Sequence, residues 1–285
     1  MTLVWRDYDQ ATLDYECNPS VMIGNQDQYL KLYAERSSAT RARRPDMIVG
    51  RYGDDPLQAI NIYPAVRPQA ALHVFVHGGG WRMLTKDDSD FVVDGLGDDA
   101  TVAAISYRLL PAVALAEVVA DVRVALAWMW RHAADYAADP ARLFLSGHSA
   151  GGHLAAMVLA PGWQQAHGMP EDAVKGALLL SGNYDLEPLR LSYRNAWLHL
   201  DDASMQVLGP IHHVPRNGPP IIVGWGEKES RQYKNQGQDF VAAWRTAGGR
   251  AEPLEIPGYN HLEVPLDLGD ANTPLAQAAR AMMRR

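Results

Sequence analysis

The stretch of sequence that decides the fold of this chain is Leu143-Phe-Leu-Ser-Gly-His-Ser-Ala-Gly-Gly-His-Leu-Ala-Ala156. Its apolar beginning, residues 143–145, predicts a short buried strand, and residues 151–159 predict a helix of small side chains. The turn between them, Gly147-His-Ser-Ala-Gly151, has the form G-x-S-x-G. Glycines on both sides allow a sharp turn that exposes the serine hydroxyl. We therefore predict that Ser149 is a nucleophile, with an ordinary strand-to-helix turn as the alternative.

Composition limits the classes of function that this chain can serve. It has 285 residues, of which 47% are hydrophobic, and we expect a single domain over residues 1–285. The net charge of −7 is spread without long blocks of one sign, which argues against nucleic acid or an anionic membrane as partner. Cys17 is the one cysteine, so no internal disulfide and no cysteine-based metal cluster can form. With no secretory signal or membrane-spanning stretch recognised, we expect a soluble, cytoplasmic protein.

Strand and helix patterns alternate along the chain. Strands are predicted at 59–63, which alternates as if half-buried, and at 72–76, 101–105, 177–181, 220–223 and 251–256; helices are predicted at 26–38, 90–99, 115–132, 233–247 and from 275. Pro253 suggests that the last strand lies at an edge. This alternation predicts an α/β fold, with a mostly parallel sheet covered by helices on both faces. We expect residues 1–50 to wrap over the core and residues 185–215 to form a small lid insertion.

A second glycine-rich motif follows the predicted strand at 72–76. In His77-Gly-Gly-Gly-Trp81, three consecutive glycines allow backbone N–H groups to point into a shared cavity. Such a loop forms half of the oxyanion hole in lipases and esterases, and the N–H after the nucleophile forms the other half. We therefore predict an oxyanion hole made by Gly79, Gly80 and Ala150. His77 is expected to have a structural hydrogen bond.

Two further residues are candidates for the substrate pocket. Trp81, which ends the glycine loop, is expected either to line the pocket or to pack in the core. His148, which precedes the candidate nucleophile, is the second candidate.

A serine hydroxyl needs a base at neutral pH, and the base needs a group that fixes its tautomer. His261 lies in the loop 257–261, after the last predicted strand, and is the predicted base. Glu227 and Glu229 both follow the strand at 220–223, and their spacing does not separate them as the acid. Asp185, after the preceding strand, is the third candidate.

Taken together, these motifs resemble the arylformamidase, or kynurenine formamidase, branch of the α/β-hydrolases, close to carboxylesterases of the hormone-sensitive-lipase type. The resemblance covers most of the chain and rests on residues 77–81, 146–156, 181–188, 226–236 and 260–261. In that branch the acid precedes a serine or threonine, with an aromatic residue and a glutamine downstream. Glu229-Ser230, followed by Tyr233 and Gln236, matches this pattern, so the resemblance implies Glu229 as the acid.

The resemblance also implies a reaction. Ser149, Glu229 and His261 would hydrolyse an aryl-formamide of the N-formylkynurenine type, or a small ester, through an acyl-serine, without cofactor or metal. The alternatives are a general carboxylesterase for short-chain or aromatic esters and, more remotely, a catalytically inactive hydrolase-fold binding protein. The expected partner is a small-molecule ester or amide, with no nucleic acid and no membrane, and a homodimer is left open.

Overall fold

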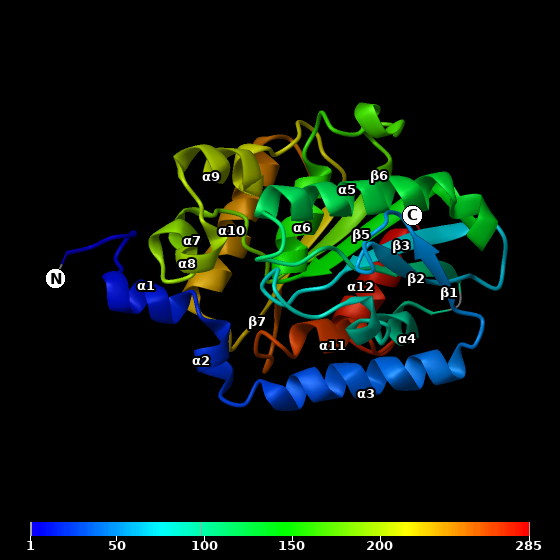
Figure 1. Cartoon of the computed structure of the whole chain (residues 1–285), viewed down its shortest axis with the longest axis horizontal. Helices are drawn as coiled ribbons and strands as arrows, with labels where there is room; N and C mark the ends of the chain where they lie inside the picture. Colours follow the sequence, from blue (N-terminus) through cyan, green and yellow to red (C-terminus); the bar gives the residue numbers. More distant parts are fainter. Residues whose placement is uncertain (1, 98, 285) are drawn as a thin grey trace.

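The computed structural model describes residues 2–97 and 99–284, and its described strands form one eight-stranded sheet (Figure 1). Their order across the sheet is β1-β2-β4-β3-β5-β6-β7-β8. The pairings β1–β2 and β2–β4 are antiparallel, whereas β3 to β8 run parallel. The predicted mostly parallel sheet is therefore confirmed. The strands are β1 (Ile48–Arg51), β2 (Ala59–Tyr63), β3 (Ala70–Val76), β4 (Ala100–Ile105), β5 (Ala138–His148), β6 (Val174–Leu180), β7 (Ile221–Gly226) and β8 (Ala251–Ile256).

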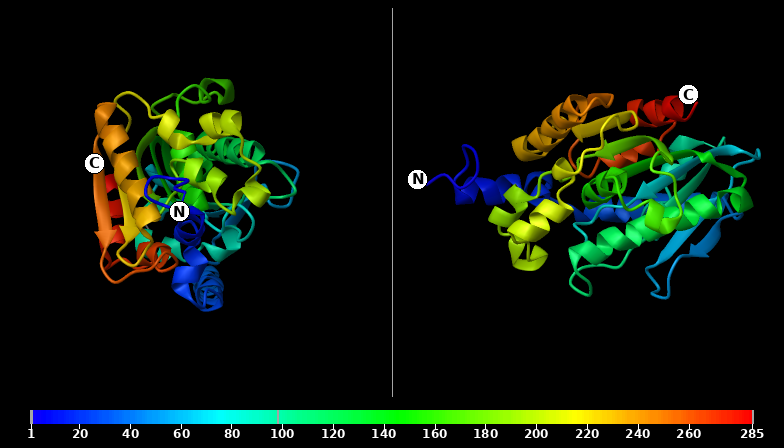
Figure 2. Two further views of the ribbon diagram at one scale, coloured as in Figure 1. Left: turned by 90° about the vertical axis from the view of Figure 1, so that its left-hand side faces the viewer. Right: turned by 90° about the horizontal axis from the view of Figure 1, so that it is seen from above.

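Helices cover both faces of the sheet, as Figure 2 shows, and each face has its own hydrophobic core. Side chains of β3 alternate between the two cores: Leu72 and Val74 face one, and Ala71 and Phe75 face the other. The first core includes residues of α5 (Leu115–Arg131), α6 (Ala150–Leu159) and α10 (Arg231–Thr246). The second includes residues of α3 (Asp27–Arg43), α4 (Val92–Leu96), α11 (Val264–Leu268) and α12 (Pro274–Met283). The sheet can be apolar along its length because both faces are covered.

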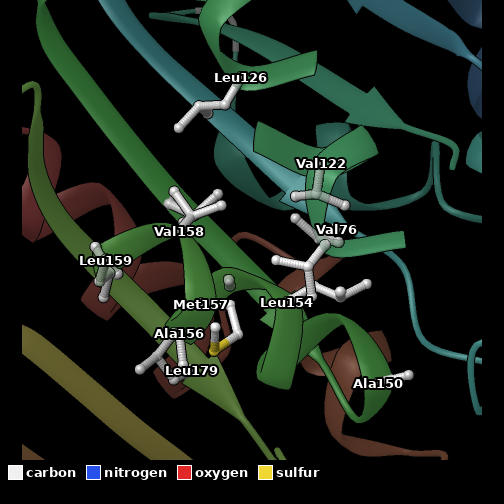
Figure 3. Close-up of a cluster of buried hydrophobic side chains, with 14 of the residues drawn as sticks. Val76, Val122, Leu126, Ala150, Leu154, Ala156, Met157, Val158, Leu159 and Leu179 are labelled. Carbon is white, nitrogen blue, oxygen red and sulfur yellow. The ribbon is translucent and has the colours of Figure 1, made fainter. Parts of the chain in front are cut away.

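The first core packs α6 against the sheet (Figure 3). Leu154 of α6 and Val122 of α5 lie next to Val76 at the end of β3. On α5, Val118, Val122 and Leu126 recur at four-residue spacing, and all three are buried. Burial of this kind stabilises by about 1.5–3 kcal/mol per large apolar side chain.

Strand β2 departs from the prediction, because all five of its residues are buried rather than half of them. The alternation came from Asn61, a polar residue in an apolar run. In the structure Asn61 donates its amide to the carboxylate of Asp90, which is itself buried and paired with Arg41. A partner far along the chain therefore satisfies the polar side chain inside the protein.

Strands β1 and β5 differ from the expectations as well. Strand β1 lies in the segment for which only wrapping was predicted, and its Ile48 and Val49 are exposed at the edge of the sheet. Residues 139–142 begin with Asp-Pro, a sequence typical of a turn, yet they belong to β5, whose first residue pairs with Ala70 of β3. Strand β8 lies at the other edge, as Pro253 predicted. The helix expected at 90–99 is the shorter α4, and Asp98 lies outside the described residues.

The predicted lid region and the beginning of the chain lie together at one end of the molecule (Figure 1). The region between β6 and β7 contains α7 (Glu187–Leu191), α8 (Asn195–Leu198) and α9 (Asp202–Leu208), and α1 (Gln10–Glu16) and α2 (Pro19–Ile23) precede α3. Gln10 donates its side-chain amide to the Leu191 carbonyl, and the Asp14 carboxylate accepts from the Tyr193 N–H. Within the described chain, no helix combines the length and apolarity needed to cross a membrane.

Candidate active site

The turn between β5 and α6 holds Ser149 in a strained backbone conformation. Its φ is +56° and its ψ is −118°, and α6 begins at the next residue. A positive φ is unfavourable for a residue with a Cβ, so the surrounding structure must impose it. One such restraint is the hydrogen bond of 2.8 Å from the Ser149 N–H to the Leu180 carbonyl at the end of β6. The side chain is thereby directed out of the sheet edge.

Close backbone contacts explain the glycines around Ser149. A Cβ on Gly151 would lie 2.1 Å from the Val76 carbonyl oxygen and 2.4 Å from that of His77. A Cβ on Gly147 would lie 2.2 Å from the Gly151 carbonyl oxygen. These carbonyl groups belong to the backbone and cannot move aside as the end of a flexible side chain can. The turn therefore packs against β3 only with glycine at these positions.

We expect Gly151→Ala to lower the free energy of unfolding by about 3 kcal/mol or more, because the new methyl group meets backbone carbonyls. Gly168→Ala is the matched control, since Gly168 has a φ of +71° but nothing within 4 Å of the added Cβ. It should cost only about 1 kcal/mol, from backbone strain. Urea denaturation of both variants measures the difference, and equal losses would contradict the steric explanation.

A chain of hydrogen bonds links Ser149, His261 and Glu229. The distance from Ser149 Oγ to His261 Nε2 is 2.9 Å, and that from His261 Nδ1 to Glu229 Oε2 is also 2.9 Å. All three residues are buried, with 7%, 4% and 8% of their surfaces exposed. An ionised Glu229 can only accept, so it fixes the tautomer with hydrogen on Nδ1 and leaves Nε2 free to accept from the serine hydroxyl. The arrangement can therefore draw a proton from Ser149.

The three candidate acids lie in different places. The Glu229 carboxylate contacts His261 and also accepts from the Gly226 N–H and the Ser181 hydroxyl. Glu227 is exposed and accepts from the Gly258 N–H. The Asp185 carboxylate accepts from the Glu187 N–H, and burial raises its pKa. Glu229 is thus the one of the three that is placed next to His261, and its catalytic role stays a prediction.

Sequence reasoning assigned no role to Ser181, which donates to Glu229. Ser181 directly follows β6 and has a φ of +49°, so its hydroxyl lies at the same sheet edge as Ser149. A polar residue immediately after a buried strand, at the carboxyl end of a parallel sheet, was the available signal.

The glycine loop after β3 faces Ser149. A Cβ added to Gly78 would lie 3.3 Å from the Ser149 Cβ. Gly79 and Gly80 have positive φ values of 93° and 62°. In the part of the chain that the structure describes, the N–H groups of Gly79, Gly80 and Ala150 donate to no protein acceptor. These donors are free to bind a developing oxyanion, and their assignment to that role stays a prediction.

His77 and Tyr107 support the glycine loop from behind. The Tyr107 hydroxyl donates to the carbonyls of His77 and Gly78, and the two rings stack with centroids 4.2 Å apart. His77 Nδ1 lies 2.9 Å from the Gly78 carbonyl oxygen, which agrees with the structural hydrogen bond expected for it.

A cavity of about 390 Å³ opens in front of Ser149. Its walls combine the glycine loop, His261, the beginning of the chain and the predicted lid region; the residues from these last two segments are Asn18, Pro19, Ser20, Gln26, Leu30 and Tyr33, and Tyr193, Arg194 and Trp197. His148 also lines the cavity, and its contact with a substrate stays a prediction. Trp81 is not among the lining residues of this cavity. Of the two roles expected for it, core packing agrees with the structure, because its fully buried indole packs against His153 with ring centroids 5.3 Å apart.

His148 supports the backbone of the predicted base. Its Nε2 lies 2.8 Å from the carbonyl oxygen of His261. Burial, together with the neighbouring His261, holds the pKa of His148 well below its ordinary value. The ring therefore stays neutral and donates from Nε2, since a carbonyl can only accept. His148 is thus a positioning residue for His261 as well as part of the cavity wall.

The first forty-odd residues hold the loops that carry Glu229 and His261. The Tyr33 hydroxyl donates to the Leu262 carbonyl, directly after His261. On the other loop, the Ser230 hydroxyl donates to the Glu16 carbonyl over 2.7 Å, directly after Glu229. Residues at the beginning of the chain therefore restrain both loops.

Buried histidines make stability depend on pH. Burial lowers the pKa of His73 to about 3 and those of His77 and His153 to about 4, from an ordinary value of 6.5. Below pH 6.5 the unfolded chain binds protons that the folded chain does not, so the free energy of unfolding falls as the pH falls. We expect a loss of about 1.4 kcal/mol per pH unit for each of these histidines.

Urea denaturation at pH 7, 6 and 5 measures this dependence. In His73→Asn the free energy of unfolding should change less steeply with pH, by the contribution of one histidine. His212→Gln, at an exposed position, should leave this pH dependence unchanged. A wild-type stability that is flat over this range would disprove the prediction.

No group of three or more His, Cys, Asp or Glu side chains that could hold a metal ion occurs within residues 2–97 and 99–284. His199, His212 and His213 therefore do not form part of such a cluster there.

Comparisons with known proteins give distant matches over the whole chain. A family model described as BD-FAE matches residues 60–174. Kynurenine formamidase of Salmo salar is 27% identical over 98% of both chains. Esterase LipQ of Mycobacterium tuberculosis is also 27% identical, over 77% of this chain and 52% of LipQ.

Solved structures share the architecture. A protein from Silicibacter sp. tm1040 superposes with a TM-score of 0.81 at 25% identity, covering 93% of this chain and 97% of that one. An esterase from Pyrobaculum calidifontis, at 19% identity, has a TM-score of 0.71 over 93% of this chain and 97% of its own, and shows likeness of fold alone.

Proposed function

We propose that this chain, an α/β-hydrolase distantly related over its whole length to kynurenine formamidases and also related to carboxylesterases, hydrolyses an aryl-formamide of the N-formylkynurenine type or a small ester. The observation that carries the proposal is the hydrogen-bond chain from Ser149 through His261 to Glu229, buried beside unpaired N–H groups. A nucleophile, a base, an orienting acid and oxyanion donors are the parts that acyl transfer needs.

In the proposed mechanism, Ser149 Oγ attacks the substrate carbonyl while His261 Nε2 takes the serine proton. Glu229 stabilises the imidazolium that forms, and the N–H groups of Gly79, Gly80 and Ala150 bind the oxyanion. His261 then protonates the departing nitrogen or oxygen, which leaves an acyl-serine. Water, deprotonated by the same imidazole, attacks the acyl-serine and releases the acid. An aryl amine is a better leaving group than an alkyl amine, which suits a formanilide to this chemistry.

The walls of the cavity support an aromatic substrate. Tyr33, Phe75, Phe91 and Trp197 contribute to them, and about 390 Å³ lies near the lower end of the volumes typical of small-molecule sites. A single aromatic ring with a short acyl group suits a volume of this size. A general carboxylesterase for short-chain or aromatic esters is the second candidate, because esterases such as LipQ are among the relatives.

Steady-state kinetics on N-formylkynurenine and on a series of p-nitrophenyl esters test the proposal. A kcat/KM for the formamide that equals or exceeds those of the esters is the expected result. Hydrolysis of the esters alone would move the assignment to carboxylesterase. No hydrolysis of either, with no labelling of Ser149 by a fluorophosphonate, would favour an inactive binding protein.

A further inference from the structure

Arg194, in the wall of the cavity, is a buried charged side chain without a counter-ion among the described residues. Arg194 follows α7 and caps the beginning of α8, and only 6% of its surface is exposed. Its Nη1 lies 3.4 Å from the Tyr233 hydroxyl, and its Cζ lies 5.5 Å from the centroid of the Trp81 ring. Among the described residues no carboxylate lies within 4 Å of its guanidinium. Four of its five N–H donors therefore lack a protein acceptor.

Two other arginines with partly buried side chains show what is missing at Arg194. Arg108 binds Asp121 through two nitrogens, at 2.8 and 2.7 Å, and Arg41 pairs with the buried Asp90. Burying a guanidinium without such a partner is costly, because the charge loses water and gains nothing of opposite sign. Among the residues that the structure describes, Arg194 lacks the carboxylate partner that these two arginines have.

The neutral groups around Arg194 do not replace a counter-ion. Burial raises the pKa of the Cys17 thiol to about 12 and also raises the pKa of the Tyr233 phenol, so both stay uncharged at neutral pH. The other charged side chains lining the cavity are Arg82, which lies over the Trp197 ring, and Asp88, whose carboxylate accepts from Thr85. The cavity therefore presents an unneutralised positive charge at Arg194.

Arg194 lies close to the reacting groups. A Cβ added to Gly80, in the predicted oxyanion loop, would lie 3.6 Å from Arg194 Nη2. The ring of Tyr233, whose hydroxyl contacts Arg194, packs against His261 with centroids 4.6 Å apart. A group bound by the guanidinium would thus lie a few bonds from a carbonyl carbon at Ser149.

We propose that Arg194 binds a carboxylate of the substrate and selects aryl formamides or aryl esters that carry one on the leaving group. This inference rests on the proposed function, in which the acyl group is small and has no place for a charge. The planar guanidinium matches a carboxylate with two parallel hydrogen bonds, and the buried position strengthens them. Arg194 is therefore a specificity-determining residue.

Matched substrate pairs test this assignment. The esters 3-acetoxybenzoate and 3-acetoxybenzamide have nearly the same shape and differ in charge, as do 3-formamidobenzoate and 3-formamidobenzamide. We expect the wild-type protein to prefer the carboxylate of each pair. Arg194→Met should lower kcat/KM for the carboxylate about 10- to 100-fold and change that for the carboxamide by less than about threefold. Arg194→Lys, which keeps the charge but not the planar fork, should give an intermediate loss.

Arg123→Met is the matched control, because Arg123 also lies over a tryptophan ring, that of Trp163, but away from the cavity. It should leave the preference for the carboxylate unchanged. Equal losses on both members of a pair in Arg194→Met would mean that Arg194 only supports Tyr233 and Trp81, and would overturn the proposal. A wild-type protein without any preference for the carboxylate would overturn it too.

The failure of the proposed function gives a different result. If the esters are cleaved and the formamides are not, the formamidase assignment fails, and the ester pair still tests Arg194. If no substrate is cleaved, or if Arg194→Met does not fold, benzoate and benzamide are compared as ligands of the wild-type protein by the shift in thermal unfolding temperature. Stabilisation by benzoate and not by benzamide is expected, and equal shifts would refute a carboxylate site.

Discussion

Replacing Ser149 by alanine is expected to lower kcat about 10⁶-fold and to leave the fold intact. The large loss follows because the hydroxyl is the proposed nucleophile and its partners act as a unit with it. Its Oγ makes one protein hydrogen bond, to His261, so little stability depends on it. Hydrolysis of an activated ester measures kcat, and circular dichroism reports the fold.

Ser146→Ala is the matched control for the loss of a buried hydroxyl. Ser146 lies three residues earlier on β5, and its Oγ is bonded to His73 inside the sheet, away from the cavity. Its activity should stay within about tenfold of wild type, since no reacting group is removed. If Ser149→Ala keeps most of the activity, Ser149 is not the nucleophile.

Glu229→Gln is expected to lower kcat about 10³- to 10⁴-fold, the second largest effect. The amide keeps the shape of the side chain but removes the charge that stabilises the imidazolium. It also replaces an oxygen acceptor with a donor, although Gly226, Ser181 and His261 all need acceptors there. The histidine tautomer with hydrogen on Nδ1 is then no longer enforced.

Glu227→Gln and Asp185→Asn serve as paired controls for this variant. Glu227 is exposed and bonded to the Gly258 N–H, so its variant should stay within a few-fold of wild type. Asp185 is bonded to the Glu187 N–H and not to His261, so its variant should lose far less than Glu229→Gln. If kcat falls further in Glu227→Gln or in Asp185→Asn than in Glu229→Gln, the residue replaced in that control is the acid.

Local constraints made the turn around Ser149 and the glycine loop predictable from the sequence. Gly147 and Gly151 must be glycines because a Cβ at either position would clash with backbone carbonyl groups. This requirement is visible in the sequence as the short G-x-S-x-G motif. The central β-strands were predictable for a similar reason, because strands buried on both faces become apolar runs. Strand β1, which is mostly exposed at the edge of the sheet, was not predicted. The mostly parallel sheet follows from their alternation with helices.

Contacts between distant residues were not predictable in this way. The spacing of Glu227 and Glu229 did not separate them, and Glu229 was favoured by the family resemblance alone; in the structure Glu229 is the one that contacts His261, 32 residues later. Asn61 made β2 look half-exposed because its partner Asp90 is 29 residues away. Arg194 gave no signal at all, since the absence of a counter-ion is a property of the folded neighbourhood. Each failure concerns a polar group whose environment is set by tertiary structure.

The restraint of the Glu229 and His261 loops by the first residues of the chain has a consequence for biosynthesis. The hydrogen bonds from Ser230 to Glu16 and from Tyr33 to Leu262 span 214 and 229 residues, so they can form only after residues 230 and 262 have left the ribosome. Helices α1 and α3 therefore lack these hydrogen-bond partners until the loops that carry Glu229 and His261 have been synthesised. A nascent chain can thus build most of its sheet while the proposed catalytic site is still incomplete, and we expect activity only after residues 257–262 have been translated.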